Sequence, residues 1–247
     1  IDNLYLYKDE GEMLTAFLDT IQDADVISGW NSEGYDIPYV VNRIQKVLSK
    51  DDTRKLCLWK QLPKKRVFER FGREQETYDL VGRVHLDSLE LYRKYTYEER
   101  HSYRLDAIGE HELGEKKTVY EGSLDQLYNQ DFRTFIEYNR QDTVLIDKLD
   151  RKLKFISLTN ELAHANTVLL QTTLGAVAVT EQAIINEAHR RGVQVPNRPK
   201  RDPESTTAAG AYVAFPKKGL HNWIGSMDIS SLYPSAVSYT HLTLPTT

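Results

Sequence analysis

The chain has 247 residues, of which 40% are hydrophobic and 28% are charged. This composition is typical of a folded protein with one large or two modest domains, and it excludes a disordered chain. No apolar run approaches the roughly 18 residues needed to cross a bilayer, so we expect no membrane partner. One cysteine cannot form an internal disulfide, and seven scattered histidines show no zinc-ligand spacing. These counts favour a reduced, intracellular compartment.

The net charge is −4, from 32 basic and 36 acidic residues, which does not by itself predict a nucleic-acid-binding protein. The distribution is uneven, because residues 54–73 hold eight basic residues against one acidic residue, Glu69. The eight basic residues are Arg54, Lys55, Lys60, Lys64, Lys65, Arg66, Arg70 and Arg73. This segment either contacts phosphates or forms an ordinary solvated surface, and the sequence leaves both interpretations open.

The first half of the chain predicts alternating strands and helices. Residues 2–12 are polar and are expected to form a loop, whereas residues 25–30 are typical of a short buried strand. Apolar residues between Ile37 and Leu48 recur at helical spacing, and Asp36 is placed to cap that helix. A hairpin is expected around residues 71–73, and a strand at 84–87 is expected to lead into a helix at 88–94.

The second half predicts mainly helices. One helix is expected at 103–113, capped by Ser102 and ended by Gly114, and a short one at 124–128. Asp131 is a plausible cap for a long helix that continues through Ile156. Another helix is expected at 174–191, followed by a linker rich in Pro, Ser and Thr that marks a domain boundary. Residues 210–215 and 223–229 are expected to be strands of an antiparallel unit.

Three acidic or aromatic residues stand where chemistry is feasible. Asp36 lies where a strand gives way to a helix, which is the edge of an α/β sheet where ligands usually bind. Tyr138 and Asp142 are four residues apart, so both side chains leave one face of a helix. Each residue also has an ordinary interpretation: a capping aspartate, a core aromatic residue and a solvated acid.

Three motifs in a particular order favour the chemical interpretation. Residues 28–39, 138–142 and 228–235 resemble, in that order, the second exonuclease motif, the third exonuclease motif and the first palm motif of the family B DNA polymerases. The resemblance is to the enzymes of large tailed bacteriophages and covers about residues 1–236. It includes the intervening segment 86–94.

The resemblance implies a fold and a domain order. The expected fold is α/β: a ribonuclease H-like exonuclease domain with a mixed sheet and flanking helices, followed by the first strands of a polymerase palm. The expected boundaries are 1–165 for the 3′–5′ exonuclease domain, 166–207 for a helix and linker, and 208–236 for the start of the palm. Residues 237–247 depart from the family pattern and resemble translated adapter DNA, so we expect them to lie outside the fold.

The resemblance also implies roles for individual residues. The implied catalytic residues are Asp36, Tyr138, Asp142 and Asp228. The implied metal ligands are the carboxylates of Asp36, Asp142 and Asp228 and the backbone carbonyl of Ile229. The implied nucleotide-binding residues are Ser231, Leu232 and Tyr233, and the implied DNA-binding residues are Asn31, Lys64, Lys65, Arg66, Gly210, Ala211 and Tyr212. Lys94 is either a cation beside the exonuclease metals or a surface lysine.

The implied chemistry is two-metal catalysis of phosphodiester hydrolysis and of nucleotidyl transfer. Carboxylate oxygens suit Mg²⁺, two ions per active site, with Mn²⁺ as an alternative. The implied partners are primer–template DNA and deoxynucleoside triphosphates, with a sliding clamp as a further partner, in the cytoplasm of a bacterial host. Since no Asp-x-Glu motif on a strand occurs before Asp36, and the family's later Asp-Thr-Asp palm motif does not occur, we expect a truncated and inactive polymerase fragment.

Two alternatives remain open from the sequence. One is a catalytically inactive DNA-binding scaffold with the same fold, which the presence of Asp36, Tyr138, Asp142 and Asp228 disfavours. The other is a stand-alone 3′–5′ exonuclease, which the motif around Asp228 disfavours. An Asp-x-Glu pair on an upstream strand would decide between the enzyme and the scaffold.

Overall fold

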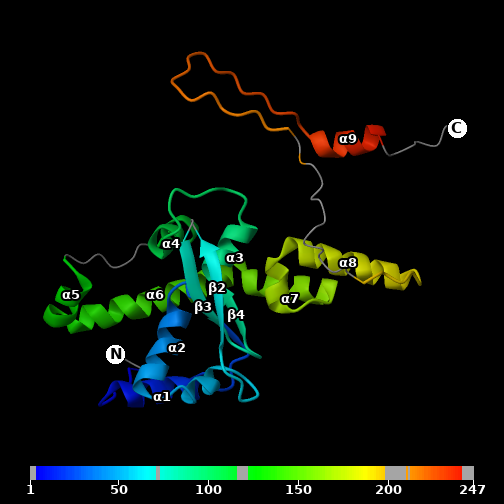
Figure 1. The fold of residues 1–247 in the computed structure, drawn as a ribbon. Helices are drawn as coiled ribbons and strands as arrows, with labels where there is room; N and C mark the ends of the chain where they lie inside the picture. Colours follow the sequence, from blue (N-terminus) through cyan, green and yellow to red (C-terminus); the bar gives the residue numbers. More distant parts are fainter. Residues whose placement is uncertain (1–3, 71–72, 116–121, 198–209, 211, 241–247) are drawn as a thin grey trace. The chain divides into compact units, whose positions relative to one another are not determined.

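A computed structural model describes residues 4–70, 73–115, 122–197, 210 and 212–240. The chain divides into two compact units, Ile1–Pro196 and Asn197–Thr247, and each unit is described by itself (Figure 1). Within the described residues no helix combines the length and the apolar character that a membrane span requires.

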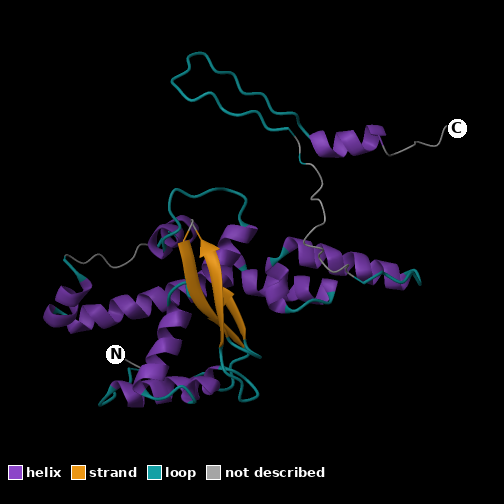
Figure 2. Cartoon of the chain, viewed as in Figure 1, coloured by secondary structure: helices purple, strands orange, loops and turns teal. Residues whose placement is uncertain are grey.

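A parallel pair of strands lies in the first unit (Figure 2). Strand β1 (Val26–Gly29) pairs with β4 (Val84–Asp87), with Ser28 opposite Leu86. Helix α2 (Asp36–Val47) follows β1 after a loop, and α3 (Ser88–Tyr95) follows β4 directly. These elements confirm the strand–helix order predicted from the sequence, and they place the carboxyl ends of both strands at one edge.

Helix α1 precedes this pair of strands in the sequence, and a two-stranded hairpin lies between them. Helix α1 (Glu10–Thr20) begins inside the segment expected to be a loop, because the Asp9 carboxylate caps it by accepting a hydrogen bond from the Glu12 N–H at 2.9 Å. Strands β2 (Lys64–Arg70) and β3 (Arg73–Asp79) form an antiparallel hairpin, as expected. Residues 71 and 72 of its predicted turn lie outside the described residues.

In the helical half, some helices begin or end at residues other than those predicted. Helix α4 (Leu105–Leu113) begins at Leu105 with Arg104 as its N-cap residue, and Ser102 only accepts a hydrogen bond from the Arg104 N–H at 3.3 Å. Helix α5 (Leu124–Gln130) follows, and Asp131 caps α6 (Phe132–Leu153), as predicted. Helix α6 ends before Ile156, because Lys154 adopts a left-handed conformation with φ of 55°.

The remaining elements of the first unit are short or helical. Helix α7 (Phe155–Asn166) starts immediately after Lys154, and α8 (Ala176–Arg190) lies close to the predicted 174–191. Two 3₁₀ turns, η1 (Asp52–Leu56) and η2 (Leu170–Leu174), complete the set.

Two apolar clusters form the core of the first unit. The first is built on α1 and α2 and contains Leu18, Val41 and Ile44. The second is built on α3, α4 and α6 around Tyr92, whose side chain is completely buried. The second cluster therefore holds α6, the helix that carries Tyr138 and Asp142.

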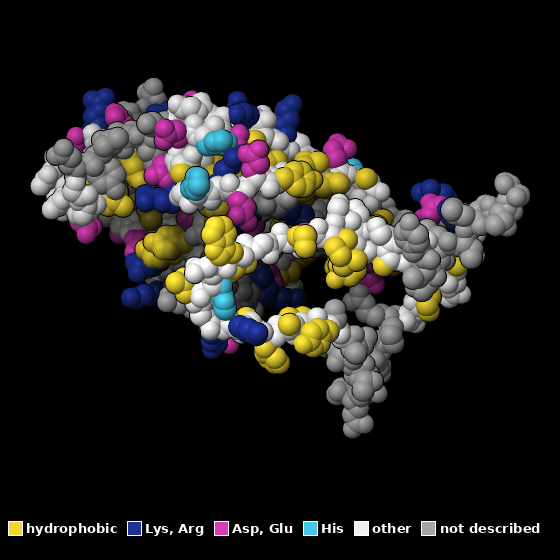
Figure 3. Space-filling model, turned by 90° about the horizontal axis from the view of Figure 1, so that it is seen from above, with side chains coloured by type: hydrophobic (Ala, Val, Ile, Leu, Met, Phe, Trp, Pro, Cys, Tyr) yellow, Lys and Arg dark blue, Asp and Glu magenta, His cyan; other side chains and the backbone are white. Residues whose placement is uncertain are grey.

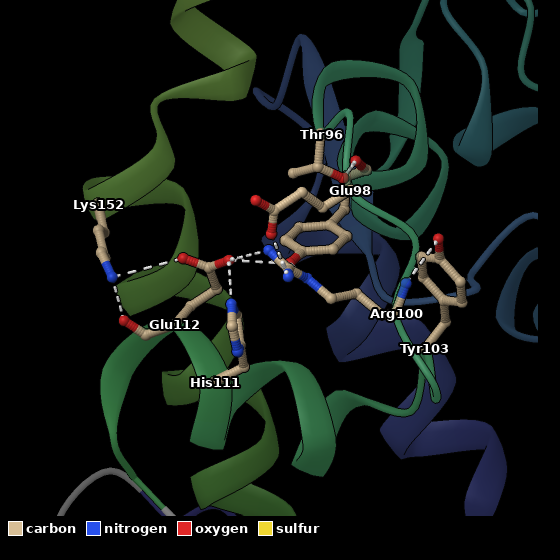
Figure 4. A network of polar contacts seen from close by, with 8 residues as sticks. Thr96, Glu98, Arg100, Tyr103, His111, Glu112 and Lys152 are labelled. Carbon is tan, nitrogen blue, oxygen red and sulfur yellow. Dashed lines mark hydrogen bonds and ion pairs between the residues drawn. The ribbon is translucent and has the colours of Figure 1, made fainter.

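A polar network continues the second cluster toward the surface (Figure 4). Glu112 of α4 accepts a hydrogen bond from the Tyr92 hydroxyl at 2.8 Å and forms ion pairs with Arg100 at 3.7 Å and Lys152 at 3.4 Å. Arg100 in turn donates to the Tyr92 hydroxyl at 3.0 Å. Because Lys152 lies on α6, one carboxylate fastens α3, α4 and α6 together.

The second unit contains helix α9 (Leu232–Thr240) and no strand among its described residues. The strands expected at 210–215 and 223–229 are therefore wrong for this structure, and Asp228 does not end a strand. Every side chain whose burial is described in this unit is exposed, and hydrophobic side chains stand on the molecular surface in Figure 3. A hairpin without a covered face has little to stabilise it in water.

Candidate active site

Asp36 and Asp142, which are far apart in the sequence, line one cavity of about 640 Å³. Asp36 contributes from the first turn of α2, and Asp142 contributes from the middle of α6. The walls include apolar residues such as Ile27 at the edge of the parallel pair and Ile146 one turn after Asp142. Two carboxylates therefore face one largely apolar hollow beside the strand ends.

Asp36 does not act as the cap that its position suggested. Tyr35 is the N-cap residue and makes no side-chain cap hydrogen bond, so Asp36 is the first residue of α2. Asp36 as a whole is exposed, but partial desolvation of its carboxyl raises the pKa above the ordinary value, while a backbone hydrogen bond and the nearby His85 act to lower it. The carboxylate is thus held at the cavity rather than used to fasten the helix end.

One face of α6 lines the cavity. Asn139, Asp142, Thr143 and Ile146 are spaced as residues on one helical face, and all four line the hollow. Asp142 is half-buried there. Tyr138 lies one turn before Asp142, as the spacing predicted, and is half-buried, but it is not one of the residues that line the hollow.

A buried carboxylate holds the loop between β1 and α2. Asp87 is 3% exposed and accepts backbone hydrogen bonds from Asn31 at 2.9 Å, Glu33 at 3.0 Å and Leu89 at 2.9 Å. Burial raises the pKa of Asp87, and these three N–H groups act against that rise. Asp87 therefore couples the end of β4 to the loop that leads into Asp36.

His85 adds a second tie between the same segments. Its Nε2 lies 2.8 Å from the hydroxyl oxygen of the buried Ser32. Burial lowers the pKa of His85 below its ordinary value of 6.5, so the ring is neutral at pH 7. The sequence interpretation missed both His85 and Asp87 as site residues. The position of Asp87 near the site was predictable, because Asp87 ends the second strand and the carboxyl ends of parallel strands meet at one edge.

The donor atoms at the cavity suit a hard cation. Asp36 and Asp142 offer carboxylate oxygens, and Asn139 offers an amide oxygen, which are ligands that Mg²⁺ accepts. Across the described ranges there is no group of three or more His, Cys, Asp or Glu residues arranged to hold a metal ion. The two carboxylates are therefore a partial ligand set.

The expected DNA-binding cations on the hairpin have acidic neighbours. Lys65 pairs with Glu76 at 2.6 Å, and Arg66 forms ion pairs with Glu33 and Asp79. Lys64 is exposed at the start of β2. Binding of phosphates by Lys65 and Arg66 requires an exchange of partners.

Two further expectations concern residues near the cavity. Asn31 is exposed and lines a neighbouring hollow of about 620 Å³ together with Arg93 and Arg104. Lys94 donates a hydrogen bond to the Leu174 carbonyl at 2.9 Å, so its ammonium group serves the contact between α3 and η2.

The expected palm residues lie in the second unit. Asp228 and Ile229 are exposed in an extended segment, and Ser231 has φ of 57° at the turn before α9. Leu232 and Tyr233 are the first residues of α9 and are exposed. Gly210 and Tyr212 are also exposed, and Ala211 lies outside the described residues. The structure describes these residues only within their own unit.

Comparison with known proteins gives consistent similarities. Residues 2–108 match the family model described as the exonuclease domain of DNA polymerase family B. Over 233 residues, or 94% of this chain, the sequence is 28% identical to the DNA-directed DNA polymerase of Escherichia phage RB69 and 25% identical to that of Enterobacteria phage T4. It is 31% identical over 245 residues, or 93% of this chain, to the DNA polymerase delta catalytic subunit of Bos taurus.

The alignments cover only part of each relative. The chain covers 26% of each phage protein and 22% of the bovine subunit. It therefore spans about a quarter of the length of the curated relatives it matches.

Proposed function

We propose, from the premise that this chain belongs to the family B DNA polymerases, that the Asp36–Asp142 cavity is the 3′–5′ exonuclease site of a proofreading polymerase. The family resemblance read from the three motifs is confirmed by the comparisons. The reaction assigned to the cavity is hydrolysis of the terminal phosphodiester at the 3′ end of a DNA strand.

The observation that carries this proposal is the convergence of Asp36 and Asp142 on one cavity. The second and third exonuclease motifs are separated by about a hundred residues, and the fold brings one carboxylate from each to the same hollow. A capping aspartate and an unrelated solvated acid have no reason to share a cavity.

The metal that fits these ligands is Mg²⁺, with Mn²⁺ as a substitute. Asp36 and Asp142 would hold it, and when bound it supplies charge stabilisation for the attacking and leaving oxygens. Asp87 and its three backbone hydrogen bonds hold the loop before Asp36 in place. We assign to Tyr138, one turn before Asp142 on α6, the role of orienting a water molecule, as the third exonuclease motif implies.

The two carboxylates explain why we expect little exonuclease activity from the isolated chain. Since they form a partial ligand set among the described residues, efficient catalysis needs ligands beyond these two carboxylates. Labelled single-stranded DNA incubated with the chain and Mg²⁺ should be degraded little. Rapid degradation would contradict the partial-site interpretation.

We extend the proposal to the palm residues on sequence grounds. In a complete polymerase, Asp228 and the Ile229 carbonyl would bind a metal ion with the incoming triphosphate, and Tyr233 would lie under the sugar. An aromatic ring in that place excludes a 2′-hydroxyl by steric clash. Tyr233→Ala should then raise ribonucleotide incorporation relative to deoxynucleotide incorporation.

The test of the proposed exonuclease site is a chimera. Residues 1–236 should replace the matching segment of the phage RB69 polymerase, with which this chain aligns over 233 residues. Primer extension by the chimera first establishes that it folds. Asp36→Asn or Asp142→Asn should then reduce excision at least 100-fold while primer extension changes less than threefold.

A matched control is Asp147→Asn on α6, because Asp147 pairs with Arg151 and is not one of the residues that line the cavity. This variant should excise normally. Unchanged excision in the Asp36 and Asp142 variants, in a chimera that excises, would refute the assignment. A chimera that extends primers but does not excise would favour the catalytically inactive DNA-binding scaffold.

A further inference from the structure

Trp59 is a large aromatic residue displayed to solvent. Its side chain is 73% exposed, although an indole normally gains free energy by burial. It lies between two hollows and lines both: one of about 440 Å³ with Arg54 and Lys60, and one of about 650 Å³ with Lys64. Basic side chains outnumber acidic ones in both hollows, four to two in the first and three to two in the second, so the exposed ring differs from a scattered surface aromatic residue.

The backbone holds this ring in place. Trp59 and Lys60 both have left-handed φ values, 52° and 56°, which are unfavourable for side chains of this size. The Leu58 N–H donates to the Val81 carbonyl at 2.8 Å, and the Arg54 guanidinium donates to the Lys60 carbonyl at 2.8 Å. Strained backbone persists where its surroundings hold it, and such places are often ligand sites.

A glycine lies directly beside the indole. Gly82 has φ of 85°, and a Cβ atom added there would lie 2.8 Å from the Cζ3 atom of Trp59. One side of the Trp59 ring therefore rests on bare backbone, and most of the ring remains accessible.

The cations around the ring include two without partners. Within the described part of the chain, the ammonium groups of Lys60 and Lys64 make no hydrogen bond or ion pair. Arg54 pairs with Asp51, and Lys55 lies 3.7 Å from Asp52. The first hollow contains two carboxylates, those of Asp19 and Asp23. It also contains four basic side chains, so its net charge is positive: Arg54, Lys55, Lys60 and the buried Arg83.

We propose that this region, the Trp59 surface (Trp59 with Arg54, Lys55, Lys60 and Lys64), binds single-stranded nucleic acid. One base stacks on the exposed face of the Trp59 indole, and Lys60 and Lys64 bind the flanking phosphates. Every base has a π face, so this contact tolerates any sequence. A partner that offers only negative charge, such as an acidic peptide, leaves the exposed indole unexplained.

The Trp59 surface is separate from the exonuclease cavity. None of its five residues lines the hollow that contains Asp36 and Asp142, although the hollow beside Trp59 that contains Lys64 shares the lining residue Leu80 with it. The proposal therefore does not rest on the exonuclease assignment. It also accounts for the basic segment 54–73, for which the sequence left two interpretations open.

The test is binding of a fluorescently labelled 12-nucleotide oligo(dT) to the full chain, measured by anisotropy with EDTA present so that metal-dependent hydrolysis does not occur. Trp59→Leu should weaken binding about tenfold or more, because base–aromatic stacking contributes that much per base. Lys60→Ala with Lys64→Ala should weaken binding similarly. It should also reduce the slope of log K against log salt by about 1.4 for two single-strand phosphates.

Matched variants separate stacking from charge and from folding. Trp59→Phe keeps a ring and should retain most of the affinity, and thermal melting checks that each variant folds. Lys50→Ala and Trp223→Leu replace exposed residues that line neither hollow, so both should bind like the wild type.

Three results would overturn the proposal. Wild-type affinity in folded Trp59→Leu would show that the indole does not stack on a base. If the double lysine variant loses binding but Trp59→Leu does not, the surface binds polyanions in general. A poly-glutamate competitor would then also displace the oligonucleotide. Weakening by Lys50→Ala as large as that by the double lysine variant would show that the loss reflects the overall charge of the chain rather than this surface.

Discussion

The two units of the chain carry their motifs in different physical settings. Residues 4–197 bury two apolar clusters, and the helices that bear Asp36 and Asp142 pack against them. Residues 210–240 bury none of the side chains whose burial is described, and Asp228 and Tyr233 stand on exposed backbone. Both units contain segments that resemble family motifs, but among the described residues only those of the first unit surround them with a core.

This difference shows that a sequence motif and a formed site are separate kinds of evidence. A motif reports ancestry wherever it occurs, whereas the geometry of a site requires elements that hold each other in place. The proposed exonuclease site therefore rests on geometry, whereas the proposed palm site rests on sequence alone.

The largest effect we expect comes from truncating one tyrosine in each unit. Tyr92 is 0% exposed and Tyr233 is 82% exposed. Tyr92→Ala should lower the free energy of unfolding by about 3–5 kcal/mol through lost burial and a cavity. Tyr233→Ala should change it by less than about 0.5 kcal/mol. Urea unfolding followed by circular dichroism measures both.

Tyr92→Phe refines that comparison. It keeps the ring but removes the hydroxyl contacts with Glu112 and Arg100, so its cost should lie between those of the two alanine variants. Equal losses for Tyr92→Ala and Tyr233→Ala would show that the second unit is packed as well.

A smaller effect should appear as a pH dependence of stability. The folded state lowers the pKa of His85, so the unfolded state binds a proton more readily and stability falls as pH drops below about 6.5. Asp36 and Asp87 have raised pKa values and act in the opposite direction at lower pH. Between pH 7.5 and 5.5 the wild type should therefore lose stability.

His85→Gln should flatten this dependence, because a neutral side chain replaces the titrating ring. The slope attributable to one proton is at most about 1.4 kcal/mol per pH unit. Urea midpoints at several pH values give the slope for both proteins. The same slope in His85→Gln and the wild type would assign the dependence to other groups.

The smallest effect concerns the end of the second unit. Deleting residues 237–247 removes the last turn of α9, Val237–Thr240, and the residues beyond the described range, with no buried side chain described among them. The melting temperature of the first unit should change by less than about 2 °C, which corresponds to less than about 0.5–1 kcal/mol. A larger drop would mean that the tail packs on the fold.

Local signals predicted the elements whose ends are set by neighbouring residues. The apolar spacing after Asp36 and the cap at Asp131 correctly predicted α2 and α6. The break at Lys154 was not predictable, because lysine has no preference of its own for the left-handed backbone that it adopts here. The strand predicted at 223–229 is not observed, because an apolar segment forms a stable strand only where it has a partner strand and a covered face.

For the candidate site, the motifs predicted which residues matter and the fold supplied what surrounds them. Asp36 and Asp142 were identified from sequence, and the structure adds that they line one cavity. The supporting roles of Asp87 and His85 depend on contacts across more than fifty residues, with the loop that follows β1. No local pattern encodes such contacts.

The most direct measurement of the central claim, that Asp36 and Asp142 form one metal site, is Mn²⁺ binding to the chain followed by electron paramagnetic resonance. Asp36→Asn and Asp142→Asn should each weaken binding at least tenfold, and the double variant should weaken it little further, because both carboxylates serve the same site. Asp147→Asn should bind like the wild type. Undiminished Mn²⁺ binding in the double variant, or an equal loss in Asp147→Asn, would contradict the account.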